Sequence, residues 1–452
     1  MISTINYIIS KRLMLIYIIF LFYFILFDYK YFNLFSLCIL GITYVFKKDI
    51  NISKTEKKIL VLTPYIFYSK KLIIGSLENI ALWNKTYLAD TPFSFADLKL
   101  TIEQLACQSE LNYLFQDKFN EMSEKCFFGS YRYGPLFHLL NWDINFNLLQ
   151  SLLPFILYFL FFIFLQALRS KSNLNEFEFN LLSISATANL LLTQLNIDLI
   201  IFLCIFFISK VFKQYRLFSI SIILILALLK QHPLGILFGL LFVEKSWKKV
   251  TPILLAVISF FTINIYFYNL DVNFLNGQPR PSVAQSSSGL LAFSQYFWVN
   301  LLNRAVGFRL VIIIFIALIS LVLYFIFFKN FITNISLNKN TETSESFEAG
   351  LLSWFLFISI YSNWDYRNII LLLLFLYFDF DKYTKLAILI IFLTSPMLNE
   401  LNIYLLPILI FFKFSSFIYV MCTCTQLLLK YETKYLKLIS ILFKKVASKN
   451  EQ

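Results

Sequence analysis

The chain has 452 residues, of which 59% are hydrophobic and only 14% are charged, with 54 Phe and 26 Tyr. Soluble domains are nearer half apolar and one quarter charged, so this composition excludes a soluble globular protein and predicts an integral membrane protein. The net charge of +13 does not by itself indicate a nucleic-acid-binding protein, because membrane proteins retain Lys and Arg on their cytoplasmic side.

The apolar segments predict an all-α, polytopic transmembrane helical bundle of about 12 to 14 spans. Several segments are shorter than the roughly 20 residues that a straight span needs, and these are predicted to be half-helices or tilted pairs shielded by neighbours. We divide the chain into N-terminal transmembrane segments (1–76), an extracytoplasmic loop (77–150), a helical core (151–429) and a cationic cytoplasmic tail (430–452). The candidate spans are 13–28, 31–46, 59–76, 151–168, 178–193, 197–209, 217–230, 234–243, 251–268, 309–328, 349–363, 368–380, 386–397 and 401–429.

Lys and Arg alternate between the predicted loops. Five Lys fall in 47–58, three cations in 210–216 and three in 245–249, and the short loops alternate between cation-rich and cation-poor along the chain. The positive-inside rule therefore places both termini in the cytoplasm, as for a multi-pass protein of a bacterial inner or plasma membrane. The amphipathic tail is expected to lie on the anionic inner surface.

The first outer loop, 77–150, is the largest predicted segment outside the membrane. It contains "SFADLKLTIEQLACQ", with Asp97 opening an amphipathic run, and "YRYGPLFHLLNWD", with Arg132 and Tyr133. Cys107 and Cys126 also lie there, and an oxidising compartment would allow them to form a disulfide. A second outer loop, about 269–308, contains Arg280 within "NGQPRPSVAQSSSG".

Three further polar clusters interrupt apolar segments at the predicted outer face. They occur in "LTQLNIDLIIF", "LILALLKQHPLGILFGLLF" and "YSNWDYRNIILLLLF". In the second, "KQHP" is predicted to join two short spans, with Pro233 starting the returning helix, where its missing N–H costs little. The polar residues of these clusters are Asn196, Asp198, Lys230, His232, Asp365 and Arg367.

Each polar residue also has a purely structural interpretation. Asp97 could cap its helix, Asn196 could hold two helices together, and Lys230 could extend to the headgroups. Asp365 and Arg367 could form an ion pair within a tight turn. The functional interpretation depends on the clusters, which come from distant parts of the chain and all map to one membrane face.

Cations and a carboxylate at a membrane surface suit an anionic, lipid-linked substrate. Lys and Arg would bind the phosphate of a polyprenyl-phosphate donor, and Asp97 would take the proton from an acceptor hydroxyl. No nucleotide-binding motif is present. No cofactor is predicted, and His138 and His232 are the only histidines, so no His-based metal cluster is expected, although a divalent metal stays open.

These motifs resemble the GT-C superfamily of polyprenyl-phosphate-sugar-dependent glycosyltransferases, in particular the family 87 mannosyltransferase-like group. The resemblance covers about residues 90–380 and is carried by Asp97, "YRYGPLFHLL", "QLNIDLI", "LLKQHPLGILFGLLF", "EKSWKK" and Asp365-Tyr366-Arg367. The chain departs from the family pattern in having Tyr-Gly-Pro for Tyr-Pro-Pro and Leu195 for the glycine of a "GN" pair.

The resemblance implies a membrane glycosyltransferase that moves a hexose, such as mannose, to a lipid or glycan acceptor on the extracytoplasmic side. Asp97 would be the catalytic base. The donor phosphate would be bound by Lys230, His232, Arg280 and Arg367. The residues expected near the acceptor, or in structural roles beside the site, are Arg132, Tyr133, Asn196, Asp198 and Asp365.

Two other classes of membrane protein remain open. A transporter or lipid flippase also uses broken helices with polar residues, but these are expected near the bilayer midplane and with inverted repeats. An O-antigen polymerase or ligase also has a large outer loop with arginines, but typically late in the chain, whereas here the largest loop is early.

Overall fold

The computed structural model describes residues 2–27, 32–45, 52–82, 136, 146–269, 287–288, 336–337, 344–360, 363–394 and 406–447. These residues are mostly helical, as predicted. In the described part of the chain, four helices are long and apolar enough to cross a membrane, or five if one bent pair forms a single span. The total of about 12 to 14 spans therefore stays a prediction. The predicted span 309–328 lies outside the described residues, as do Asp97, Cys107, Cys126, Arg132, Tyr133 and Arg280.

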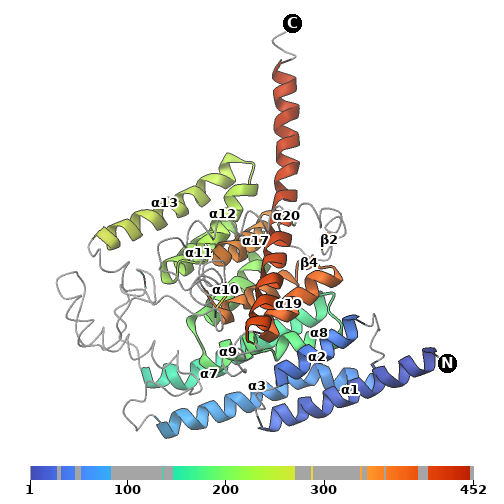
Figure 1. The fold of residues 1–452 in the computed structure, drawn as a ribbon. Coiled ribbons are helices and arrows are strands. Elements are labelled where there is room, and N and C mark those ends of the chain that lie inside the picture. Colours follow the sequence, from blue (N-terminus) through green and yellow to red (C-terminus); the bar gives the residue numbers. More distant parts are fainter. Residues whose placement is uncertain are drawn as a thin grey trace.

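The N-terminal helices and α7 lie along one side of the molecule (Figure 1). Asn180 of α8 ties this group together, because its side-chain carbonyl accepts a hydrogen bond from the Tyr17 hydroxyl (2.7 Å) and its amide donates to the Leu60 carbonyl (2.7 Å). Buried side-chain amides of this kind join helices where apolar contacts alone give little specificity. The elements of this group are α1 (Ile2–Phe27), α2 (Phe32–Val45), α3 (Lys54–Leu82), α7 (Phe146–Lys171) and α8 (Glu176–Ser183).

The predicted span 178–193 is not one continuous helix. The chain instead forms α8 and then α9 (Ala186–Gln194), separated at Ile184 and Ser185. The Ser185 side chain accepts a hydrogen bond from the Ala188 amide and so caps the second helix. Serine at this position favours a new helix start over a continuous apolar helix.

Two helical hairpins follow. The first consists of α10 (Ile197–Val211) and α11 (Arg216–Leu229). The second consists of α11 and α12 (Leu234–Val243), which are connected by a short joint. The predicted pair of short helices around "KQHP" is confirmed, with Pro233 immediately before the first residue of α12. At the other end, Arg216 forms an ion pair with the buried Glu244 (2.6 Å), which holds the start of α11 against the end of α12. The chain continues into α13 (Trp247–Asn269).

Glycines allow α12 to pack closely on α17 (Glu345–Ile360). A Cβ atom added to Gly239 would lie 2.5 Å from the Ala349 carbonyl oxygen, and one added to Gly235 would lie 2.9 Å from the Trp354 Cα. Such small-residue faces bring helix backbones together in membrane proteins. The contact fixes the beginning of α12 beside Trp354.

The segment after α17 is only partly helical, and its residues 368–378 are buried. The predicted span 368–380 is not one continuous helix, because the chain forms a 3-10 turn, a helix of five residues and a short strand. Each end pairs with a distant segment: Ser287–Ser288 with Asn363–Trp364, and Ser336–Leu337 with Phe378–Asp379. These elements are β1 (Ser287–Ser288), β2 (Ser336–Leu337), β3 (Asn363–Trp364), η5 (Asp365–Ile369), α18 (Ile370–Leu374) and β4 (Phe378–Asp379).

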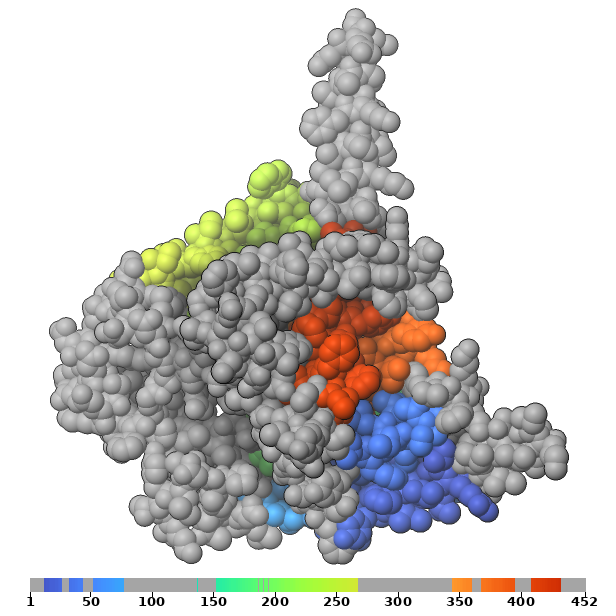
Figure 2. All heavy atoms as spheres, in the orientation of Figure 1, coloured from blue at the N-terminus to red at the C-terminus, as the bar shows by residue number. Residues whose placement is uncertain are grey.

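The last two helices join the two sides of the molecule. α19 (Lys382–Thr394) packs on α2, and in Figure 2 the orange surface of the 367–394 region meets the blue surface of the first helices. α20 (Leu406–Ala447) packs on α17 and α19 and then continues as one helix away from the bundle (Figure 1). The predicted tail is thus a direct extension of the last span.

A candidate anion-binding site at the helix breaks

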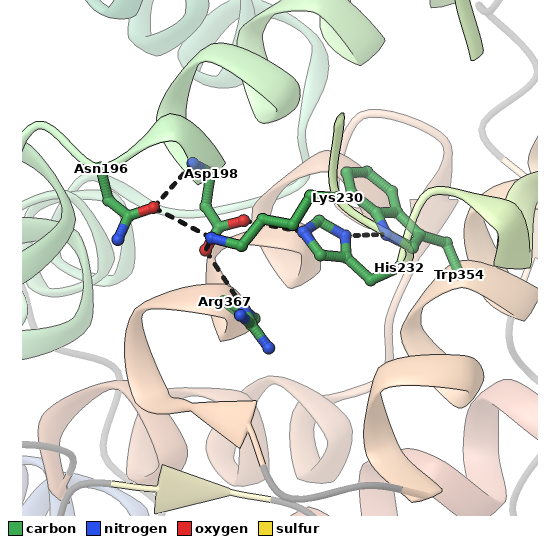
Figure 3. A network of polar contacts seen from close by, with 6 residues as sticks. All are labelled: Asn196, Asp198, Lys230, His232, Trp354 and Arg367. Atoms are coloured by element: carbon green, nitrogen blue, oxygen red, sulfur yellow. Dashed lines mark hydrogen bonds and ion pairs between the residues drawn. The ribbon is translucent and has the colours of Figure 1, made fainter. Parts of the chain in front are cut away.

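Asp198 lies at the centre of a buried polar cluster (Figure 3). Its Oδ2 atom is 2.7 Å from Lys230 Nζ and 3.2 Å from Arg367 Nε, and its Oδ1 atom is 2.7 Å from His232 Nε2. Both carboxylate oxygens therefore have close partners. With every oxygen engaged, this carboxylate is poorly placed to accept a proton from a substrate.

The two helical hairpins explain why these residues meet. α10 and α11 run antiparallel and have almost the same length, 15 and 14 residues, so the first turn of α10 and the end of α11 lie at the same end of the hairpin. Asp198 is in that first turn, and Lys230 is the residue that ends α11. Both charges suit the helix dipoles, because a carboxylate is favoured at an N-terminus and a cation at a C-terminus.

Asn196 connects the backbone break to the cluster. It precedes the first residue of α10, and its side-chain oxygen accepts a hydrogen bond from the Asp198 amide (3.0 Å) and another from Lys230 Nζ (3.2 Å). The residue before it, Leu195, has left-handed backbone angles (φ 48°, ψ 46°). This conformation lets the chain turn sharply between α9 and α10, whose axes differ by 109°.

Trp354 and Arg367 reach the cluster from the C-terminal part of the chain. Trp354 of α17 donates its indole N–H to His232 Nδ1 (2.9 Å) and is almost fully buried. Arg367, in the 3-10 turn η5, is the most exposed side chain that binds Asp198, at 18% against 8% for Lys230 and for His232. The adjacent strand β3 pairs with Ser287–Ser288, so part of the predicted second outer loop lies beside η5.

The structure thus brings together five of the predicted site residues. Lys230, His232 and Arg367 were predicted to bind the donor phosphate, and Asn196 and Asp198 to lie near the acceptor or in structural roles. One structural interpretation is overturned, because Lys230 does not extend to the surface but is buried on Asp198. Arg367 also pairs with Asp198, and its predicted ion pair with Asp365 stays a prediction. For Asp365 the structure describes only the backbone, within η5.

Trp354 is the residue of this cluster that sequence reasoning missed. It stands alone within an apolar run, "GLLSWFLFISI", and carries no local polar signal. Asp198 was predicted near the site but not as its centre. A carboxylate and a cation at the breaks of two consecutive short helices were the available signal for that pairing.

The chemistry of the cluster is that of an anion site. With the imidazole neutral, two permanent cations, Lys230 and Arg367, contact one carboxylate, that of Asp198. Among the described residues, no group of three or more His, Cys, Asp or Glu side chains is placed to hold a metal ion.

Comparisons of this chain with protein-family models, with curated proteins and with solved structures find no match.

Proposed function

We propose that the chain is an integral membrane glycosyltransferase that transfers a hexose, such as mannose, from a polyprenyl-phosphate donor to a lipid or glycan acceptor on the extracytoplasmic side. In this proposal the Asp198 cluster binds the donor phosphate through Lys230 and Arg367. Asp97, which lies outside the described residues, is assigned the role of general base by its resemblance to the GT-C pattern.

The observation that supports this proposal is the pair of cations that the cluster gathers on Asp198 at a helix break. Charged side chains within membrane segments are costly, and in membrane proteins such residues mark substrate or ion sites. Arg367 is the more exposed of the two cations, at 18% against 8% for Lys230. A phosphate monoanion placed beside Arg367 would be bound by its guanidinium group, which binds phosphate oxygens with two parallel hydrogen bonds.

Lys230 and Arg367 would also act during sugar transfer. As the bond between the anomeric carbon and the phosphate oxygen breaks, negative charge grows on the leaving phosphate. Fixed cations stabilise that charge more in a water-poor site than in bulk solvent. Lys230, held by Asp198 and Asn196, is already oriented and loses little freedom on binding the donor.

The direct test is transfer of label from radiolabelled polyprenyl-phosphate mannose and glucose by purified protein in liposomes, with an extract of acceptor lipids. Arg367→Ala is expected to raise the donor KM by about tenfold to a hundredfold, the equivalent of one charge-assisted hydrogen-bond pair. Lys57→Ala is the matched control, since it removes a solvent-exposed ion pair with Glu176 remote from the cluster. No transfer from any donor, or equal loss in both variants, contradicts the proposal.

A transporter or flippase of an anionic lipid is the second candidate. The 109° bend between α9 and α10, with polar residues at the break, favours it because many transporters build their sites from discontinuous helices. The liposome assay separates the two functions. A flippase moves the labelled lipid between leaflets with its sugar still attached, whereas a transferase releases polyprenyl phosphate.

A further inference from the structure

The Trp354–His232 contact determines the protonation of the imidazole. An indole N–H can only donate a hydrogen bond, so His232 Nδ1, 2.9 Å from Trp354 Nε1, must be an unprotonated acceptor. On the other side, Asp198 Oδ1 is a carboxylate oxygen, so Nε2, at 2.7 Å, must carry the hydrogen and donate it. The imidazole is therefore neutral, with its proton on Nε2.

A second proton on His232 would have to enter at Nδ1, directly opposite the indole N–H. The two rings are nearly parallel, with an interplanar angle of 10° and centroids 5.7 Å apart, and both are buried. Among the described residues, the charged groups that face the imidazole are Asp198 of α10, Lys230 at the end of α11 and Arg367 of η5. Asp198 favours the second proton, and the two cations oppose it.

The position of Trp354 is itself fixed by the glycine contact between α12 and α17. The backbone around Trp354 lies against Gly235, three residues after His232, and a Cβ atom at Gly235 would be only 2.7 Å from the Phe357 Cβ. The helix pair thus holds the donor N–H of one ring opposite the acceptor nitrogen of the other.

We infer that Trp354 is a positioning residue that keeps His232 as a neutral, Nε2-protonated donor to Asp198. Asp198 Oδ2 is then reserved for Lys230 and Arg367, and the charge of His232 does not change when its surroundings become acidic. The inferred protonation depends only on the hydrogen-bond geometry, whereas its consequence for donor binding rests on the proposed function.

Nitrogen-15 NMR of labelled histidine tests the protonation directly, because the chain contains only two histidines. A His138→Gln background leaves His232 as the single signal. We expect one protonated and one unprotonated ring nitrogen, assigned to Nε2 and Nδ1, with shifts that stay constant from about pH 8 to about pH 5. A signal that titrates near the ordinary histidine range, or a proton on Nδ1, would overturn the inference.

Trp354→Phe tests the role of the indole. Phenylalanine is smaller and has no N–H, so water can enter and accept a hydrogen bond from a protonated Nδ1; His232 is then expected to titrate on acidification. Trp247→Phe is the matched control, since Trp247 is 79% exposed and remote from the cluster. If Trp354→Phe folds and gives the wild-type pH series, the indole does not position the imidazole. If it does not fold, the wild-type spectrum still decides the protonation.

Donor binding provides a second measurement, made with a prenyl phosphodiester whose single negative charge does not change in this pH range. The wild-type Kd is expected to be constant with pH. In Trp354→Phe the affinity should increase on the order of tenfold on acidification, as His232 gains positive charge. A constant Kd in both proteins contradicts the inference, whereas no binding by either, with the expected NMR result, contradicts only the proposed function.

Discussion

Leu195 has a left-handed backbone conformation, which is disfavoured for leucine. It is the non-glycine residue with positive φ in the part of the chain that the structure describes. A left-handed backbone conformation costs an L-amino acid roughly 1–2 kcal/mol, and the motif that "QLNIDLI" resembles has glycine at this place. The Leu195 side chain is only 1% exposed, so its burial offsets the backbone cost.

Substitutions at Leu195 separate these two effects. Leu195→Ala and Leu195→Gly both lose the buried side chain, but only glycine relieves the left-handed strain, so the glycine variant is expected to be the more stable by about 1 kcal/mol. At Leu199, buried in the regular helix α10, the order should reverse by about the same amount. Unfolding by denaturant in detergent micelles measures all four variants. If the alanine and glycine variants have the same order of stability at both positions, the backbone of Leu195 is not strained.

The charge balance at Asp198 makes a second prediction. Asp198→Asn removes the carboxylate that Lys230 and Arg367 both contact, and breaking a buried ion pair from one side costs about 3–5 kcal/mol. Adding Lys230→Met to this variant removes one of these two cations and should recover part of the loss. Unfolding free energies of the single and double variants measure the coupling. A double variant less stable than Asp198→Asn alone would contradict the pairing.

At the scale of elements, helix breaks were more predictable than helix lengths. "KQHP" and "QLNID" carry proline, charge and capping residues, and both mark real helix ends. By contrast, the apolar run after Arg367 has the composition of a span, yet forms η5, α18 and β4. Its conformation depends on pairing with Ser287–Ser288 and Ser336–Leu337, which are distant in sequence, and local hydrophobic periodicity contains no information about such partners.

The glycine contact between α12 and α17 can be tested against a glycine in open space. Gly239→Ala places a Cβ atom 2.7 Å from the Gly350 Cα, so the helices must separate, at a cost of about 1–3 kcal/mol. Gly41→Ala is the matched control, because no atom lies within 4 Å of its added Cβ, and alanine should there leave stability unchanged or raise it by up to about 1 kcal/mol. Thermal unfolding in detergent compares the two. Similar effects would exclude close helix packing as the role of Gly239.

At the scale of the whole molecule, helix length determines how deep the cluster lies. α11 has 14 residues and rises about 21 Å, and α12 has 10 residues and rises about 15 Å. Both are shorter than a hydrocarbon core of about 30 Å. If Arg216 and Lys248 mark the inner boundary, the joint with Lys230 lies within the membrane thickness, below the predicted headgroup depth. Protein must then enclose the cluster, in agreement with its burial.

The sequence indicated which residues form the site, but not how they are arranged. The charges and breaks are local signals, and they placed Lys230, His232 and Arg367 on one face of the membrane. The packing of α10, α12, α17 and η5 determines which oxygen of Asp198 each group binds. The same packing brings the Trp354 indole N–H to His232 Nδ1.

Cysteine labelling tests both sidedness and depth. In a background without native cysteines, Lys248→Cys and Ser170→Cys, both at exposed positions, should react with an impermeant maleimide only in inside-out vesicles. Gln231→Cys, exposed in the joint between α11 and α12, should react only from the opposite face. If the joint lies below the surface, a small methanethiosulfonate should modify it faster than the bulky maleimide does. Labelling of Gln231→Cys from the same side as Lys248→Cys would contradict the hairpin, and equal rates with both reagents would place the joint at the surface.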